Sequence, residues 1–150
     1  MKRKYLTIFL ISIVGIWLVW FLLKPAEPQN QATVKIGNTI YKVDIADTEV
    51  EREQGLSGRP SLARDSGMLF VFPEKRPYAF WMKDMQFPLD FIWIADNQIA
   101  DMTASVPVPS GNNLPTYQPQ VPVDLILEIN AGEIKKQGFQ IGQKVDIKLK

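Results

Sequence analysis

The 150-residue chain has an ordinary globular composition, with 46% hydrophobic residues, 22% charged residues and a formal net charge of +1. It has neither Cys nor His, which excludes disulfides, thiol catalysis, and the commonest neutral-pH base and transition-metal ligand. The length predicts one domain with an appendage, and the apolar content predicts that this domain folds.

The positive charge is concentrated at one end of the chain. Four of the 17 basic residues flank a hydrophobic segment, namely Lys2, Arg3, Lys4 and Lys24. The rest of the chain has 13 basic and 16 acidic residues. Binding of the phosphate backbone requires a concentrated basic surface. We therefore expect no nucleic-acid partner.

Residues 5–23 contain no charged side chain and predict a transmembrane helix. At about 1.5 Å per residue, a helix of this length spans roughly the 30 Å hydrocarbon core of a bilayer. The basic residues 1–4 are expected to remain in the cytoplasm, because positive charges favour the inner side of the membrane. The polar, Pro-containing residues 24–32 then form a linker, and residues 33–150 form a domain outside the cytoplasmic membrane, in the periplasm or at the cell exterior.

A cleaved signal peptide is the alternative interpretation of this segment. Such a peptide usually has a shorter apolar region that ends in a small-x-small site. Ala26 has no small residue two positions before it. The sequence therefore favours an uncleaved signal anchor.

The first half of the domain shows strand and helix patterns in alternation. Residues 33–36 and 40–45 alternate and flank Gly37-Asn38, which predicts a hairpin. Thr48 and Glu51 have capping-box spacing, and Gly55 is placed to end a short helix. The apolar runs 68–72 and 78–82, joined by a segment bounded by prolines, predict a second hairpin.

The second half contains further strands and one long loop. Residues 89–94 and 98–105 predict a strand pair around Asp96-Asn97, and residues 106–122, with five prolines, predict an irregular loop. A strand at 123–129, a helix capped near Asn130 and a final strand at 144–149 follow. The predicted class is mainly β (α+β): a small curved antiparallel sheet or barrel with two short helices, preceded by one transmembrane helix.

A set of short motifs in fixed order resembles the bacterial and archaeal family called domain of unknown function 192. The resemblance covers about residues 35–150 and implies a compact β-rich domain, often behind a signal peptide or membrane anchor, with no established activity. Ser57 and Asp84-Met85 depart from the residues that are frequent in the family. The motifs are Ala46, EREQGL at 51–56, Arg59, GMLF at 67–70, FWMK at 80–83, PLD at 88–90, Leu127-Glu128, Ala131-Gly132 and Gly142.

Two groups of side chains are candidates for ligand binding. Arg52 and Arg59 could hold a carboxylate or phosphate through their planar guanidinium groups, although internal salt bridges would also explain them. Trp81 and Lys83 share one face of a predicted strand and, with Tyr117 from the Pro-rich loop, could line an aromatic groove. Core packing is the alternative for these aromatic residues.

Three carboxylates are candidates for chemistry, namely Asp84, Asp90 and Glu128. A pair of carboxyl groups can hydrolyse a glycosidic bond when their separation is suitable. The alternative for Asp90, which lies at a strand start, is hydrogen bonding to loop amides. The sequence contains no calcium-loop, nucleotide-binding or nucleophile-elbow motif, and it predicts no metal or cofactor.

These observations favour a membrane-anchored extracytoplasmic module that binds a small molecule, a glycan or an envelope protein. One alternative is a carboxylate-based envelope hydrolase that acts on glycans, and another is a structural partner of an envelope protein. The sequence favours a binding protein over an enzyme and assigns no catalytic residue. The candidate ligand-binding residues are Arg52, Arg59, Trp81, Lys83, Asp84, Asp90, Tyr117 and Glu128.

Overall fold

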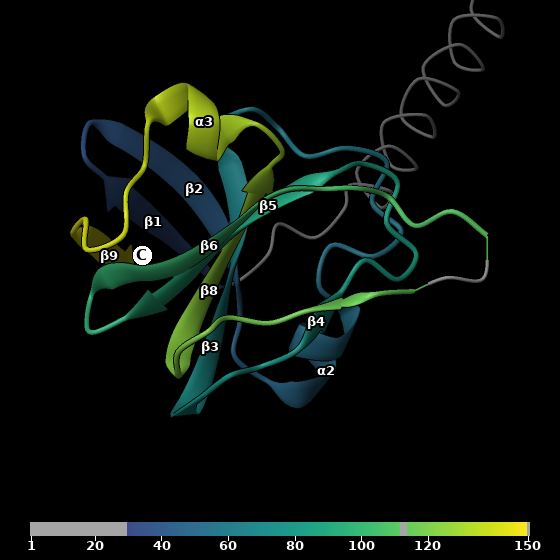
Figure 1. Ribbon diagram of the computed structural model, residues 1–150, viewed down its shortest axis with the longest axis horizontal. Helices are drawn as coiled ribbons and strands as arrows, with labels where there is room; N and C mark the ends of the chain where they lie inside the picture. The colour runs from purple at the N-terminus through teal and green to yellow at the C-terminus, as the bar shows by residue number, and fades with distance from the viewer. Residues whose placement is uncertain (1–29, 112–113, 150) are drawn as a thin grey trace, which may run out of the picture.

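The computed structural model describes residues 30–111 and 114–149. In this part of the chain a seven-stranded sheet curls into a half-barrel that carries two short helices (Figure 1). The predicted membrane helix at residues 5–23 lies outside the described residues. None of the helices formed by the described residues has the length and apolar character needed to span a bilayer.

The seven strands of the main sheet lie in the order β6-β5-β8-β3-β2-β1-β9. A separate ladder of two short strands joins β4 to β7. The elements are β1 (Gln31–Ile36), β2 (Thr39–Ala46), α2 (Glu49–Gln54), β3 (Ser66–Arg76), β4 (Phe80–Trp81), β5 (Leu89–Ala95), β6 (Gln98–Val106), β7 (Thr116–Tyr117), β8 (Val123–Asn130), α3 (Glu133–Gln137) and β9 (Val145–Leu149).

The sheet is mixed, and in this respect the antiparallel prediction is wrong. All neighbouring strands run antiparallel except β2 and β3, which are parallel. A parallel pair needs a crossover, and residues 47–65, which include α2, supply it. This crossover places α2 beside the end of β3.

Two of the predicted hairpins are confirmed. β1 and β2 pair around a two-residue turn in which Gly37 has a φ of 59°. β5 and β6 pair around Asp96 and Asn97, whose φ angles of 51° and 57° suit a tight hairpin turn.

The predicted hairpin between residues 68–72 and 78–82 is wrong. β3 continues to Arg76 and pairs with β2 and β8, so both of its edges are occupied. The short strand β4 instead pairs with β7, which lies within the Pro-rich segment expected to be irregular. The apolar character of residues 68–72 and 78–82 is visible in the sequence, but their partners are not. β3 forms longer ladders with β2 and β8 than it could form with the two-residue strand β4.

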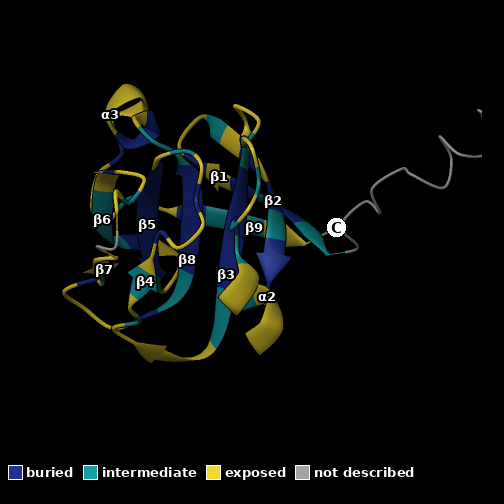
Figure 2. Ribbon diagram, turned by 90° about the vertical axis from the view of Figure 1, so that its right-hand side faces the viewer, coloured by how far each residue is buried: buried dark blue, intermediate teal, exposed yellow. Residues whose placement is uncertain are grey.

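The sheet is apolar on both faces. Leu69, Ile92 and Leu127 belong to a core on one face, whereas Phe70, Trp93 and their neighbours form a core on the other. Buried residues accordingly run along the central strands (Figure 2). At one end the outer edges meet, because Ile99 N–H donates to Gln143 O at 2.9 Å and Gly142 N–H donates to Ile99 O at 2.7 Å.

The two helices begin in different ways. The predicted capping box of α2 is confirmed: Thr48 and Glu51 each accept a hydrogen bond from the other's backbone N–H. The prediction of Asn130 as the cap of the second helix is wrong, since α3 begins after Gly132. The Asn130 side chain instead donates to the carbonyls of Leu62 and Ala63, both at 3.1 Å, and so anchors the crossover loop.

Candidate functional site

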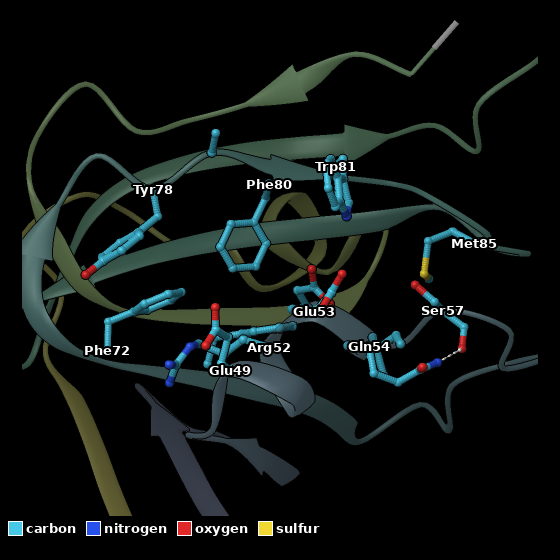
Figure 3. Close-up of a pocket in the computed structure, with 15 residues that line it drawn as sticks. Glu49, Arg52, Glu53, Gln54, Ser57, Phe72, Tyr78, Phe80, Trp81 and Met85 are labelled. Atoms are coloured by element: carbon cyan, nitrogen blue, oxygen red, sulfur yellow. Dashed lines mark hydrogen bonds between the residues drawn. The ribbon is translucent and has the colours of Figure 1, made fainter. Parts of the chain in front are cut away.

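A pocket of about 400 Å³ opens between α2 and the segment that leads into β4 (Figure 3). This volume lies within the roughly 300–1,000 Å³ range of small-molecule sites. Aromatic side chains from β3 and β4 face polar side chains from α2. The lining residues are Glu49, Arg52, Glu53, Gln54, Gly55, Leu56, Ser57, Phe70, Phe72, Tyr78, Ala79, Phe80, Trp81, Met85 and Glu128.

The aromatic side of the pocket is held by ring contacts. Phe72 and Tyr78 stack with ring centroids 3.7 Å apart, and the Phe80 ring meets Phe70 edge-on at 4.8 Å. Phe80 also packs edge-on against the buried Trp93 ring at 5.6 Å. These contacts fix the ring orientations. Trp81 is 49% exposed and lies at the opening of the pocket.

The polar side of the pocket is α2, which is tied to the sheet by Arg52. The Arg52 Nη1 atom donates to Asp47 O at 2.5 Å and to Val71 O at 2.8 Å. Its guanidinium carbon lies 5.0 Å from the centroid of the Phe72 ring, which is a cation–π distance. The aromatic wall therefore already accepts one cation against a ring face.

Glu128 is a buried acid that lines the pocket. It lies on the central strand β8, where its cross-strand neighbours are Met68 and Phe91, and it is only 4% exposed. Among the described residues its carboxyl group has no hydrogen-bond or ion-pair partner. Burial raises the pKa of this carboxyl to about 8, so the group is mainly protonated at neutral pH.

The backbone carbonyl of Glu128 occupies the space that a side chain at position 67 would need. A Cβ atom placed on Gly67 would lie 2.6 Å from the Glu128 carbonyl oxygen, which no real side chain permits. The glycine of the GMLF motif therefore allows β3 to approach β8 at the residue that carries the buried carboxyl. This contact gives a structural reason for glycine at position 67.

Three of the eight predicted site residues, Arg52, Trp81 and Glu128, line this pocket. Lys83 and Asp84 lie instead in the adjoining loop, where they line two other depressions of about 390 and 510 Å³. Sequence reasoning missed the acidic residues Glu49 and Glu53 and the aromatic residues Phe70, Phe72, Tyr78 and Phe80. Phe70 and Phe72 are two residues apart, as are Tyr78 and Phe80. This spacing is the signal that could have indicated a shared strand face within each pair.

Arg59 and Tyr117 make internal contacts. The Arg59 Nη1 atom lies 2.8 Å from the Asp44 Oδ2 atom in a partly exposed ion pair. Tyr117 belongs to the β4–β7 ladder, and its ring packs edge-on against Phe91 at 5.9 Å. Neither residue lines the pocket.

Asp90 lies on the opposite face of the sheet from Glu128. It pairs in register with Ile129, whereas Phe91 pairs with Glu128. Its two carboxylate oxygens accept the backbone N–H groups of Ser105 at 2.7 Å and Ile134 at 2.8 Å. The side chain thus supplies the cap that the first turn of α3 lacks, and the sheet separates it from Glu128.

Within the described ranges 30–111 and 114–149, no group of three or more acidic side chains is arranged to hold a metal ion. The pocket lining offers aromatic faces, three carboxyl groups, one guanidinium, the Gln54 amide and the hydroxyl groups of Ser57 and Tyr78.

Comparison with known proteins places this fold among proteins without an established activity. The chain is similar to a crystal structure from Sinorhizobium meliloti, of a protein provisionally called a transcription regulator. The two share 33% identity over 78% of this chain and 92% of that one, with a TM-score of 0.67. A protein of unknown function from Novosphingobium aromaticivorans is 27% identical over 77% of this chain and 83% of its own, with a TM-score of 0.68.

No curated protein matches the chain. A family model described as "Uncharacterized ACR", the domain of unknown function 192 family, matches residues 32–147. This match contains the motifs that line the pocket and those that shape the sheet around it. Because it spans most of the chain, the protein belongs to the domain of unknown function 192 family.

Proposed function

We propose that the domain is a binding module for a small molecule, which enters the pocket between α2 and β4. The observation that carries this proposal is the Glu128 carboxyl, which is buried, faces the pocket and has no partner among the described residues. Burial of a carboxyl group costs stability when no hydrogen bond compensates it. A ligand that pairs with this carboxyl would offset that cost.

The aromatic wall supports the same proposal. Binding pockets combine apolar surface, which supplies affinity, with a few polar groups that fix orientation. Here the rings of Phe72, Tyr78 and Phe80 are held by mutual contacts, and Trp81 stays half exposed at the opening. A large exposed ring beside a formed pocket is typical of a binding surface.

The glycan hydrolase predicted from Asp84, Asp90 and Glu128 is supported less well. Hydrolysis by two carboxyl groups needs both of them beside one substrate bond. Asp90 lies on the other face of the sheet and accepts two backbone N–H groups, and Asp84 lies in the adjoining loop. The proposed function therefore assigns Glu128 a role in binding.

We also propose that the module acts outside the cytoplasmic membrane, tethered by residues 5–23. The uncharged run and the preceding basic residues of the sequence support this location. A tethered binding module would meet ligands of the cell envelope, whether small molecules or glycan fragments.

A fragment screen on the full chain in detergent tests the binding proposal. We expect water-soluble aromatic compounds to raise the thermal unfolding temperature of the wild type, and we expect Trp81→Ala to abolish this shift. Ile40→Ala is the matched control, because Ile40 is also a half-exposed apolar residue but lies outside the pocket. A shift that survives Trp81→Ala, or a screen without any shift, would contradict the proposal.

A further inference from the structure

The charged groups of the pocket are mostly acidic. Glu49 and Glu53 from α2 and Glu128 from β8 line it, against the single guanidinium of Arg52. Tyr78 is the other titratable side chain in the lining. Cross-strand from Glu128, β3 and β5 present only the apolar side chains Met68 and Phe91. The charges that face Glu128 across the pocket therefore come from α2.

The Arg52 guanidinium is largely committed to the protein itself. Its Nη1 atom donates to two backbone carbonyls, and its guanidinium carbon lies over the Phe72 ring. No ion pair joins Arg52 to Glu49 or Glu53 within the described residues. Arg52 thus neutralises none of the three carboxyl groups by direct contact.

Building on the proposed function, we propose that the pocket selects ligands that carry a cationic amine beside an aromatic or apolar group. The amine would donate to the Glu128 carboxylate. Among the three acidic residues of the pocket lining, Glu128 alone is buried. The rings of Tyr78, Phe80 and Trp81 can attract a cation through their quadrupoles, whereas the Phe72 ring already has Arg52 and Tyr78 against it. The apolar part of the ligand would pack on the same rings.

Proton release follows from this arrangement. Burial keeps Glu128 protonated in the empty pocket at neutral pH, because its pKa is about 8. An ammonium group beside the carboxyl favours the ionised form, so ligand binding would expel one proton. The affinity should rise with pH up to about 8 and then level off, since the carboxyl is already ionised above that value.

Three probes with one aromatic ring and different head groups test the proposal. They are 2-phenylethylammonium, 2-phenylethanol and phenylacetate, each titrated into the full chain in detergent by calorimetry at pH 7 and pH 8. We expect the ammonium to bind about tenfold or more tightly than the alcohol or the carboxylate. Titration in buffers of different ionisation enthalpy should show release of nearly one proton per ammonium bound at pH 7.

Glu128→Gln keeps the side-chain shape but cannot become an anion. This variant should lose the preference for the ammonium and the proton release, while it still binds the alcohol. Glu74→Gln is the matched control, because Glu74 is an exposed acid outside the pocket lining. Equal binding of ammonium and alcohol would overturn the cation proposal and leave the binding pocket in place. Tighter binding of phenylacetate would overturn the cation proposal and would indicate an anion site at Arg52. No binding of any probe would overturn both the cation proposal and the proposed binding function.

Discussion

At the scale of single residues, the proposed ligand binding depends on the Glu128 carboxyl, whose burial lowers the stability of the fold. The folded state keeps a proton on Glu128 up to a pH of about 8, whereas an ordinary Glu releases it near 4.5. Between these values the folded protein binds one proton more than the unfolded chain, so stability falls as pH rises. Below pH 4.5 Glu128 is protonated in both the folded and the unfolded state, so its ionisation costs no stability. Above about pH 8 it is ionised in both states, and the loss of stability has reached its full value.

Glu128→Gln should remove this pH dependence. We expect the wild type to lose up to about 1.4 kcal/mol of unfolding free energy per pH unit between pH 5 and pH 8. The variant should show a flatter profile and should be the more stable protein at pH 8. Urea unfolding of both proteins across this range measures the difference. The absence of His simplifies the comparison, and parallel profiles would show that Glu128 is not the titrating group.

Asp90 should behave in the opposite way, as a stabilising residue with no part in binding. Its two oxygens accept the N–H groups of Ser105 and Ile134, and Asn would replace one acceptor with a donor. Asp90→Asn should therefore cost about 2–4 kcal/mol of unfolding free energy. The control Asp84→Asn, in the adjoining loop, should change stability by less than about 0.5 kcal/mol. Urea unfolding at pH 7 measures both changes, and a cost below 1 kcal/mol for Asp90→Asn would contradict this assignment.

At the scale of elements, α2 determines how the acidic rim faces the aromatic wall. The helix has only six residues and no buried side chain, so its ends contribute much of its stability. Thr48→Ala removes the side-chain half of the capping box and should cost about 1 kcal/mol. We expect the affinity of any ligand that contacts Glu49 or Glu53 to fall as well. Thr48→Ser keeps the hydroxyl and should retain both the stability and the ligand affinity. A loss in both variants would show that packing of the Thr48 methyl group, and not the capping hydrogen bond, is responsible.

The same elements show which parts of the fold can be predicted from sequence. Hairpins around Gly37 and around Asp96-Asn97 were predictable because turn chemistry acts between neighbouring residues. The partners of β3 and β4 were not predictable, because distant strands compete for the same edges. The lining of the candidate pocket was predicted only in part for a similar reason. Arg52, Trp81 and Glu128 were named from their residue types, but the pocket that joins them exists only after the crossover places α2 beside β3.

At the scale of the whole molecule, the proposed anchor at residues 5–23 would decide which ligands the pocket can meet. The full chain should remain with the membrane fraction after an alkaline carbonate wash, because a helix of this apolar length is not extracted without detergent. Protease added to spheroplasts should cleave the domain while cytoplasmic markers stay intact. Recovery of a soluble protein that begins after residue 24 would instead identify a cleaved signal peptide.

The proposed binding role of the pocket depends on the ionisation of Glu128, and NMR measures this property directly. The full chain in detergent micelles, with glutamate labelled by 13C at the side-chain carboxyl carbon, would be titrated from pH 4 to pH 10, and Glu128→Gln would identify the resonance by its loss. We predict that this resonance titrates near pH 8. A value near 4.5 would contradict the account, because it would mean that the carboxyl is hydrated or already paired and needs no ligand.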